Sequence, residues 1–402
     1  MNCLKWLLLL WLIFFTVCPL PASATTTNFP APGDLPAPHL TRQAGEEGQD
    51  LDMEMVEGFI NRLDSEIQAS IPQMSFKNLL IKLARGDVQW KPADIFHSLL
   101  TCFFKEVVAN SALLGKLIIL AIICAVLQNL TNAFERGTTG QLSYMVVYLA
   151  LVTIAISSFA LAINTGREVV DKMVSFMQAI LPLLLTLLVA MGGVASAAIF
   201  HPVILVSLTI IGTLTKNVVL PLIFFSAILG IVDHLSSHFK VSHLAGLLKT
   251  VAMGLLGIFG TVFLGVLAVQ GAAGAVSDGV TLRTAKFAID AFIPVVGGVF
   301  SDALEAIVSS SLLIKNAAGI AGMIAVLLIM GLPLLKILTL ALIYKLAGAL
   351  VQPVAEGQVV DCLNDLGGSM IMVFAVVAVV GLLFFFAITI LVGVGNLTVM
   401  LR

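Results

Sequence analysis

Two charged residues stand inside apolar stretches of the chain and are the first candidates for chemistry. Asp290 lies in the short apolar segment 287–300, and Lys336 lies beside Pro333 in the apolar segment 320–351. A charged side chain inside a bilayer is costly, and such residues commonly mark ion pathways or substrate sites. Asp290 and Lys336 are therefore candidates for a pathway or a gate. Four other lysines are expected to extend their ammonium groups to a membrane surface: Lys116, Lys216, Lys315 and Lys345.

Glycine and proline accompany these charges. Asp290 is followed by Pro294, Gly297 and Gly298, while three glycines recur at every third position of another apolar segment: Gly254, Gly257 and Gly260. Small residues let helices approach closely or let a helix bend. Close packing explains them, and a mobile or pore-lining element is the functional alternative.

The patterns that would indicate an enzyme or a metal site are incomplete. Ser196 and His201 lie five residues apart, but no residue is positioned to orient the histidine as a base. His234, His238 and Asp233 have helical metal-ligand spacing in what we interpret as an ordinary polar loop. Gly115-Lys116 lacks the upstream glycine of a phosphate-binding loop. We predict no catalytic, metal or cofactor residues, and energy supplied by a gradient or a separate ATPase.

The composition identifies the class of protein. Hydrophobic residues make up 59% of the chain and charged residues 11%, against about 25% charged in soluble proteins. Apolar runs of membrane-spanning length succeed one another after about residue 110. The chain is therefore predicted to be an all-α, polytopic membrane protein, and its net charge of −2 favours no nucleic-acid partner.

The first quarter of the chain has a different character. Residues 1–24 have the charged start, apolar centre and Ala22-Ser23-Ala24 end of a signal peptide, which places the chain from Thr25 onward outside the cytoplasm. Residues 25–50 are Pro-rich and are typical of a flexible linker. Residues 51–108 contain apolar positions at helical spacing, with acidic residues between them in 51–67 and a last helix starting near Pro92. They are expected to form a small extracytoplasmic helical region.

Residues 109–402 are expected to form a membrane domain of about six to nine spans. Four windows are long enough to cross a bilayer core of about 30 Å, namely 113–130, 142–163, 251–270 and 370–394. The windows 176–200 and 320–351 contain Pro182 and Pro333, and 287–300 is short enough to be a re-entrant or broken element.

Loop charges suggest an orientation. The segment 233–249 carries Lys240 and Lys249 and is predicted to be cytoplasmic, whereas the acidic segment 352–366 is predicted to be outside. With the N-terminus outside, a cytoplasmic 233–249 needs an odd number of spans before it. This favours a hairpin of two short helices in 201–232 over a single long helix.

An internal repeat is a further hypothesis. Residues 179–182 and 220–222 match residues 291–294 and 332–334 at one shared offset of 112 residues. The two copies would lie near 142–235 and 254–351, and a basic loop in one copy would correspond to an acidic loop in the other. That exchange is the pattern of an inverted-topology repeat.

Taken in order, the signal segment, acidic amphipathic region and Pro-broken, Gly-rich spans resemble the stage III sporulation protein AE family over nearly all of residues 1–402. The resemblance rests on the segments 71–91 (IPQMSFKNLLIKLARGDVQWK), 176–202 (FMQAILPLLLTLLVAMGGVASAAIFHP) and 287–315 (FAIDAFIPVVGGVFSDALEAIVSSSLLIK). These are family-like patterns and not active-site signatures, so no catalytic residue is transferred.

The resemblance implies a subunit of a channel or secretion-like complex needed for endospore formation. The protein would lie in the mother-cell membrane that faces the forespore. Its partners would be the lipid bilayer, other proteins of the stage III sporulation A operon, including a cytoplasmic ATPase and ring-forming proteins, and a forespore-side membrane protein. Two alternatives remain open: an assembly scaffold that transports nothing, and a free-standing secondary transporter.

Overall fold

Long α-helices make up nearly all of the described structure. The computed structural model describes residues 92–133, 138–235, 240–292, 297–354 and 357–400, all within the unit Gln49–Arg402. No strand occurs among these residues, so the all-α prediction is confirmed. The predicted signal peptide, the linker and residues 51–91 of the amphipathic region lie outside the described residues.

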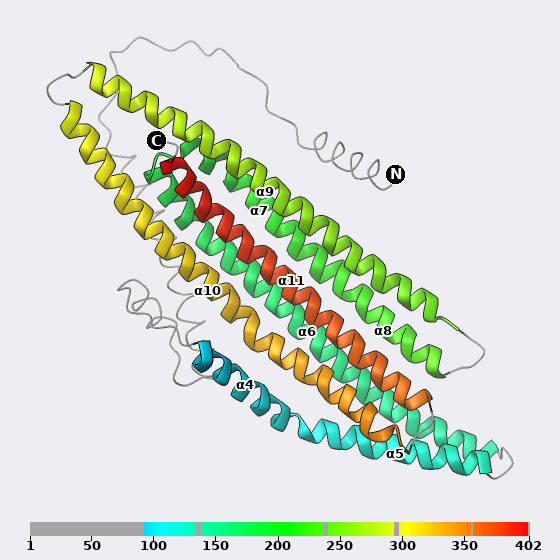
Figure 1. The fold of residues 1–402 in the computed structure, drawn as a ribbon. Helices are drawn as coiled ribbons and strands as arrows, with labels where there is room; N and C mark the ends of the chain where they lie inside the picture. Colours follow the sequence, from blue (N-terminus) through cyan, green and yellow to red (C-terminus); the bar gives the residue numbers. More distant parts are fainter. Residues whose placement is uncertain (1–91, 134–137, 236–239, 293–296, 355–356, 401–402) are drawn as a thin grey trace, which may run out of the picture. The chain divides into compact units, whose positions relative to one another are not determined.

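The helices are joined in chain order by short connections (Figure 1). The predicted helix near Pro92 is confirmed as α4, Pro92–Ala109, and the first predicted span is α5, Ser111–Ala133. The remaining elements are α6 (Thr138–Ala190), α7 (Val194–Leu214), the π-helix η1 (Thr215–Val219), α8 (Leu220–Leu235), α9 (Ser242–Phe292), α10 (Gly297–Val351) and α11 (Gln358–Met400).

Six of these helical runs are long and apolar enough to cross a membrane, which confirms the polytopic prediction. The first has 20 such residues, the length of an ordinary span. The other five have 40 to 49, which corresponds to about 60–75 Å at 1.5 Å per residue. Each of these five is therefore about twice as long as a bilayer core of about 30 Å is thick.

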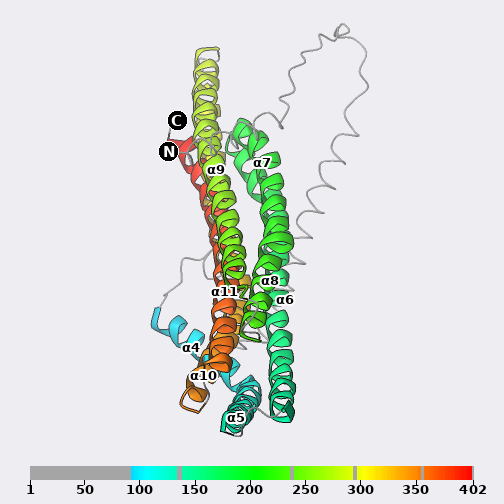
Figure 2. The same cartoon turned by 90° about the vertical axis from the view of Figure 1, so that its right-hand side faces the viewer.

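Helix α11 forms the centre of the bundle. It packs against α6, α8, α9 and α10, and both views place it among them (Figures 1 and 2). It carries no Asp, Glu, Lys or Arg between Leu366 and Met400. A helix that is apolar on every side is suited to burial on every side, and half of its apolar window is buried, against 22% for α5.

Small residues set the distance between α10 and its neighbours. A Cβ added to Gly319 would collide with the side chain of Val392 on α11, and one added to Gly322 would collide with Ile180 on α6. Without side chains at these positions the backbones approach closely and gain van der Waals contact.

The turn after α6 corrects the predicted span 176–200. Helix α6 ends at Ala190, and Gly192 has a φ of +87°, a conformation that favours glycine. Helix α7 then begins at Val194. Residues 287–300 contain the end of α9 at Phe292 and the beginning of α10 at Gly297. The predicted re-entrant or broken element stays a prediction, because residues 293–296 lie outside the described part of the chain.

The predicted hairpin in 201–232 is wrong. The chain remains helical from Val194 to Leu235, and η1 joins α7 to α8 with right-handed helical dihedral angles at both of its ends. The polar residues Thr215, Lys216 and Asn217 suggested a turn. The Lys216 ammonium instead lies 2.7 Å from an Asp171 carboxylate oxygen on α6, so the polar group has a partner without a break in the helix.

The prediction that 233–249 and 352–366 lie on opposite sides of the membrane is also wrong. His234 Nε2 lies 2.9 Å from Asp365 Oδ2, so the two segments meet at one end of the bundle. Both proposed repeat copies consist of two antiparallel helical runs, and both copies begin at the end of the bundle where His234 meets Asp365. The two copies therefore have the same topology and are not inverted relative to one another. The repeat itself stays a prediction.

This geometry predicts that Lys240→Cys and Gln352→Cys react from the same side of the membrane. Both positions are exposed at the end where His234 meets Asp365. The measurement is labelling by a membrane-impermeant thiol reagent in right-side-out and inverted vesicles, on a background without the native cysteines. Labelling of the two positions from opposite sides would contradict the described fold.

Candidate functional site

The predicted pathway residues around Asp290 lie at the two ends of a gap in the described residues, 293–296. Asp290 belongs to the last residues of α9, and Gly297 and Gly298 open α10. The surroundings of these three residues, and the whole of Pro294, lie outside the described part of the chain. Their pathway role stays a prediction.

Pro333 and Lys336 lie on α10, which continues without interruption from Gly297 to Val351. Both residues are half-buried. The Lys336 side chain has no hydrogen bond or ion pair with another described residue. The structure therefore keeps Lys336 as a candidate but does not bring it together with Asp290 in a described contact.

The three glycines of α9 have different surroundings. A Cβ added to Gly260 would lie 3.0 Å from the side chain of Leu383, so this residue packs against α11. A Cβ added to Gly254 or Gly257 would meet no atom within 4 Å. These two glycines therefore lie on the exposed face of α9 and are not needed for packing within the chain.

A buried carboxylate that sequence reasoning did not select holds the start of α7. Asp278 on α9 is 2% exposed, and its two oxygens accept the backbone N–H groups of Ala195 (2.9 Å) and Ser196 (3.1 Å). Gly193, at the N-cap position, provides no side-chain cap. Asp278 thus supplies the acceptors that the first turn of a helix lacks, from a helix more than 80 residues later in the sequence.

Lys315 corrects another expectation. It was predicted to extend to a membrane surface, but it is 0% exposed, and its Nζ has no hydrogen-bond partner. A Cβ added to Gly395 on α11 would collide with this Nζ and would lie 3.1 Å from Met191 in the α6–α7 turn. Tight packing by α11 and the turn covers the lysine, so its ammonium has no route to the surface.

Asp278 and Lys315 belong to one polar layer near the α6–α7 turn. The Ser196 Oγ and the amide oxygens of Asn316 and Asn396 are buried there without partners. Buried polar groups without partners are uncommon in proteins. The Ser196–His201 pair does not form a nucleophile and base, since His201 is exposed and the Ser196 Oγ has no partner. The layer can hold a proton or orient a polar group, and no base lies within hydrogen-bond reach of Ser196 among the described residues.

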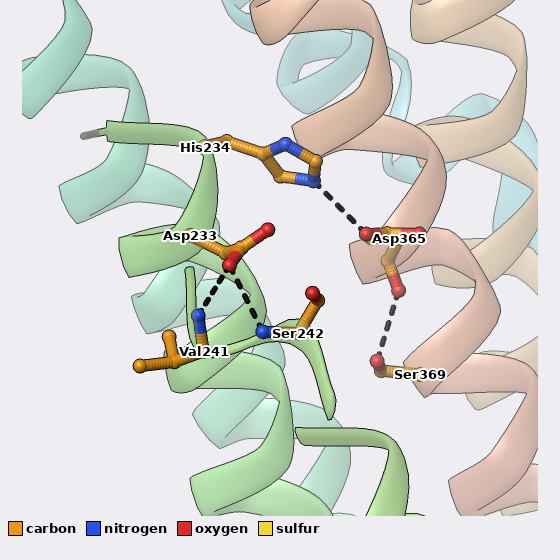
Figure 3. Close-up of polar contacts among 6 residues, drawn as sticks. All are labelled: Asp233, His234, Val241, Ser242, Asp365 and Ser369. Carbon is orange, nitrogen blue, oxygen red and sulfur yellow. Dashed lines mark hydrogen bonds and ion pairs between the residues drawn. The ribbon is translucent and has the colours of Figure 1, made fainter. Parts of the chain in front are cut away.

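A second polar cluster lies at the opposite end of the same helices (Figure 3). Asp233 Oδ1 accepts the backbone N–H groups of Val241 (2.6 Å) and Ser242 (2.9 Å), and so caps α9. The neighbouring His234 contacts Asp365 on α11. Asp233 is thus engaged in a helix cap and His234 in a contact with Asp365. No group of three metal-ligand residues occurs in the described ranges.

A third group of charges lies midway along the long helices. Lys216 pairs with Asp171 at 2.7 Å, and Lys172 pairs with Glu168 at 3.2 Å. Lys216 belongs to the π-helix η1, and π-helical turns often occur at functional sites. Arg167 lies one residue before Glu168, and its Nε is buried without a partner.

The signals for these groups were present but ambiguous in the sequence. Asp278 follows a segment of small residues, and from the sequence alone a buried capping aspartate there cannot be distinguished from an exposed loop aspartate. Lys315 lies at the edge of an apolar run, where lysines usually reach the interface. Only the packing of Gly395 and Met191 shows that this lysine does not.

We expect Asp278→Ala to destabilise the protein, because it leaves the N–H groups of Ala195 and Ser196 without acceptors. An unsatisfied buried donor costs about 1–3 kcal/mol. The measurement is the melting temperature of the purified protein in detergent. Asp278→Asn keeps one acceptor oxygen and should lose less stability. The exposed neighbour Ser277 gives the control Ser277→Ala, and equal melting temperatures for Asp278→Ala and Ser277→Ala would refute the cap.

We expect Lys315→Met to keep or raise the melting temperature. An ammonium without acceptors contributes the cost of its dehydration and no compensating bond, and methionine fills a similar volume. Lys336→Met, at a half-buried position, is the comparison. A clearly lower melting temperature for Lys315→Met would mean that the lysine has a stabilising partner. Normal stability with lost sporulation would assign Lys315 a functional role.

Comparisons with known proteins identify the family. The model of the family described as stage III sporulation protein AE matches residues 74–395. The chain is 45% identical, over 352 residues, to the stage III sporulation protein AE of Bacillus subtilis (strain 168), and the alignment covers 88% of each chain. No solved structure matches the chain. The extent of the family match and this identity show that the chain belongs to the stage III sporulation protein AE family.

Proposed function

We propose that this chain is the membrane-embedded core subunit of a channel or secretion-like complex that connects the mother cell to the forespore. The chain belongs to a stage III sporulation family and has six apolar helices of spanning length. It lacks an ATP-binding motif, which is consistent with energy from a separate cytoplasmic ATPase. The other partners would be ring-forming proteins and a protein of the forespore membrane.

The observation that carries the proposal is the length of the exposed apolar surface on α9. Exposed apolar side chains continue along this helix from Leu244 to Val280, and Val269 is 69% exposed. That stripe extends about 54 Å at 1.5 Å per residue, whereas a bilayer core covers about 30 Å. The remaining apolar surface needs a protein cover, as a subunit of a larger assembly would have.

The same face of α9 is suited to another helix. Gly254, Gly257 and Gly265 have no atom within 4 Å of an added Cβ, and Thr261, Ala268 and Ala272 are exposed beside them. A stripe of small residues lets a second backbone approach closely in a membrane. This supports an interface with a neighbouring subunit, on a face that includes Gly254 and Gly257, two of the glycines that the sequence had selected for a pathway.

The proposed orientation depends on the helix count. A cleaved signal peptide would leave the N-terminal region outside the cytoplasm, and three runs precede residue 236. The predicted cytoplasmic position of 233–249 is therefore kept with three spans in place of five. Residues 352–366 would then also face the cytoplasm, where an ATPase could contact both segments.

A cysteine-accessibility map tests the proposal. Single cysteines along 251–271 and 287–300, on a background without native cysteines, would be probed with an impermeant thiol reagent in the assembled complex and in the isolated protein. Labelling with helical periodicity at membrane depth, found only in the complex, would support a shared aqueous pathway. Labelling confined to the loops would favour the scaffold. Labelling together with transport by the isolated protein would favour a secondary transporter.

Two substitutions complete the test. Gly257→Leu should keep the protein level normal, because the position is open within the chain, but should reduce sporulation by obstructing a subunit contact. Asp290→Asn should reduce sporulation if its charge serves the pathway. Normal sporulation and normal protein levels in both variants would contradict a pathway in these segments.

A further inference from the structure

A small pocket lies between α6 and α8, midway along the bundle. Its volume is about 180 Å³, and it opens to the outside of the bundle. Two polar residues of α6, Asn164 and Arg167, line it together with Pro221, Phe224 and Phe225 of α8 and the apolar Ala160 and Ile163. The pocket therefore combines a cation with an aromatic, apolar wall.

Arg167 is the cation left over in the central group of charges. That group contains three cations, Arg167, Lys172 and Lys216, and two carboxylates, which pair with the two lysines. The Arg167 Nε is buried without a hydrogen-bond partner. A guanidinium has five N–H donors and cannot lose its charge, so an anion in the pocket that reached its terminal nitrogens would compensate that charge.

The pocket is polar at one end and apolar at the other. Arg167 lies at the end nearer to the ion pair of Lys216 and Asp171, whereas Ala160 lies about 10 Å further along α6 at 1.5 Å per residue. Helix α8 also runs in that direction, and it contributes Phe225, which is 57% exposed. A ligand that fits this surface has an anionic head at Arg167 and a long apolar chain over Phe225.

We propose that this pocket binds the phosphate headgroup of an anionic phospholipid, with the Arg167 guanidinium as its ligand and an acyl chain lying over Phe224 and Phe225. Arginine suits phosphate because its planar fork donates two parallel hydrogen bonds to the oxygens. Basic pockets between membrane helices bind anionic headgroups in this way. The site depends on neither the transport role nor the partners proposed above.

The site also gives the bundle a position in the membrane. A headgroup at Arg167 places one bilayer surface at the central charges. Along η1 and α8, Lys216 and Asp233 are separated by about 25 Å at 1.5 Å per residue, close to the thickness of a bilayer core of about 30 Å. The second surface then lies at the cluster of Asp233, His234 and Asp365.

The test is lipid retention by the full-length protein. Purified protein would be incubated in detergent with phosphatidylglycerol, phosphatidylcholine or inorganic phosphate, and bound lipid would be counted by native mass spectrometry. The expected result is a preference of about tenfold for phosphatidylglycerol, which Arg167→Gln abolishes. Lys172→Gln removes the same charge from a paired neighbour and should keep the preference.

Each other outcome overturns the proposal. Equal retention of the two lipids would exclude recognition of an anionic headgroup. Loss of preference in Lys172→Gln as well would indicate general surface charge. Full displacement of lipid by inorganic phosphate would indicate a small-anion site. If Arg167→Gln does not fold, Arg167→Lys keeps the charge without the planar fork of N–H donors and should weaken the preference, and an unchanged preference would refute the site.

Discussion

A bilayer core contains no water to bond the backbone, so every N–H and C=O group in it needs a partner within the protein. Long uninterrupted helices satisfy this requirement, and five of the apolar runs here reach 40 to 49 residues. The requirement is hardest to meet where a helix begins inside the bundle. At Val194 the chain has no cap of its own, and the carboxylate of Asp278 supplies it from α9. This one interaction joins the α6–α7 turn to the second half of the chain.

The same scarcity of water organises the charges. They gather at three levels of the bundle, and at each level a carboxylate either caps a helix or pairs with a cation. Asp233 caps α9, Asp365 meets His234, and Asp171 meets Lys216. Two cations depart from this rule, because Lys315 Nζ and Arg167 Nε are buried without partners. Lys315 is closed in by α11, whereas Arg167 lines an open pocket, so only Arg167 can reach a ligand from outside.

Length and surface together leave the described helices with more exposed apolar surface than a bilayer core covers. The five longest helices exceed a bilayer core, and apolar side chains remain exposed along most of α9. Two of the glycines on that face contact nothing in the chain. A protein that worked alone would need a polar surface on the part outside the bilayer. The surface fits a sporulation complex better than a free-standing transporter, which is why the assembly is the centre of our proposal.

Some properties of this protein were determined by the sequence alone. Apolar runs without charge predict membrane helices because burial in lipid is a local property of each segment. The first span and the start of α4 at Pro92 were predicted from such local patterns, and the resemblance to the sporulation family came from the order of the segments.

Tertiary structure decided what depends on partners distant in sequence. Thr215, Lys216 and Asn217 looked like a turn, and only Asp171 on another helix shows why the helix continues. The charges of 233–249 and 352–366 suggested opposite sides of the membrane, whereas the contact between His234 and Asp365 puts both segments at the same end. Lys315 was predicted to reach the membrane surface, but α11 covers it. From its local sequence a charged side chain is predicted to be exposed. The groups that the fold brings beside it decide whether it is buried and how much free energy its burial costs.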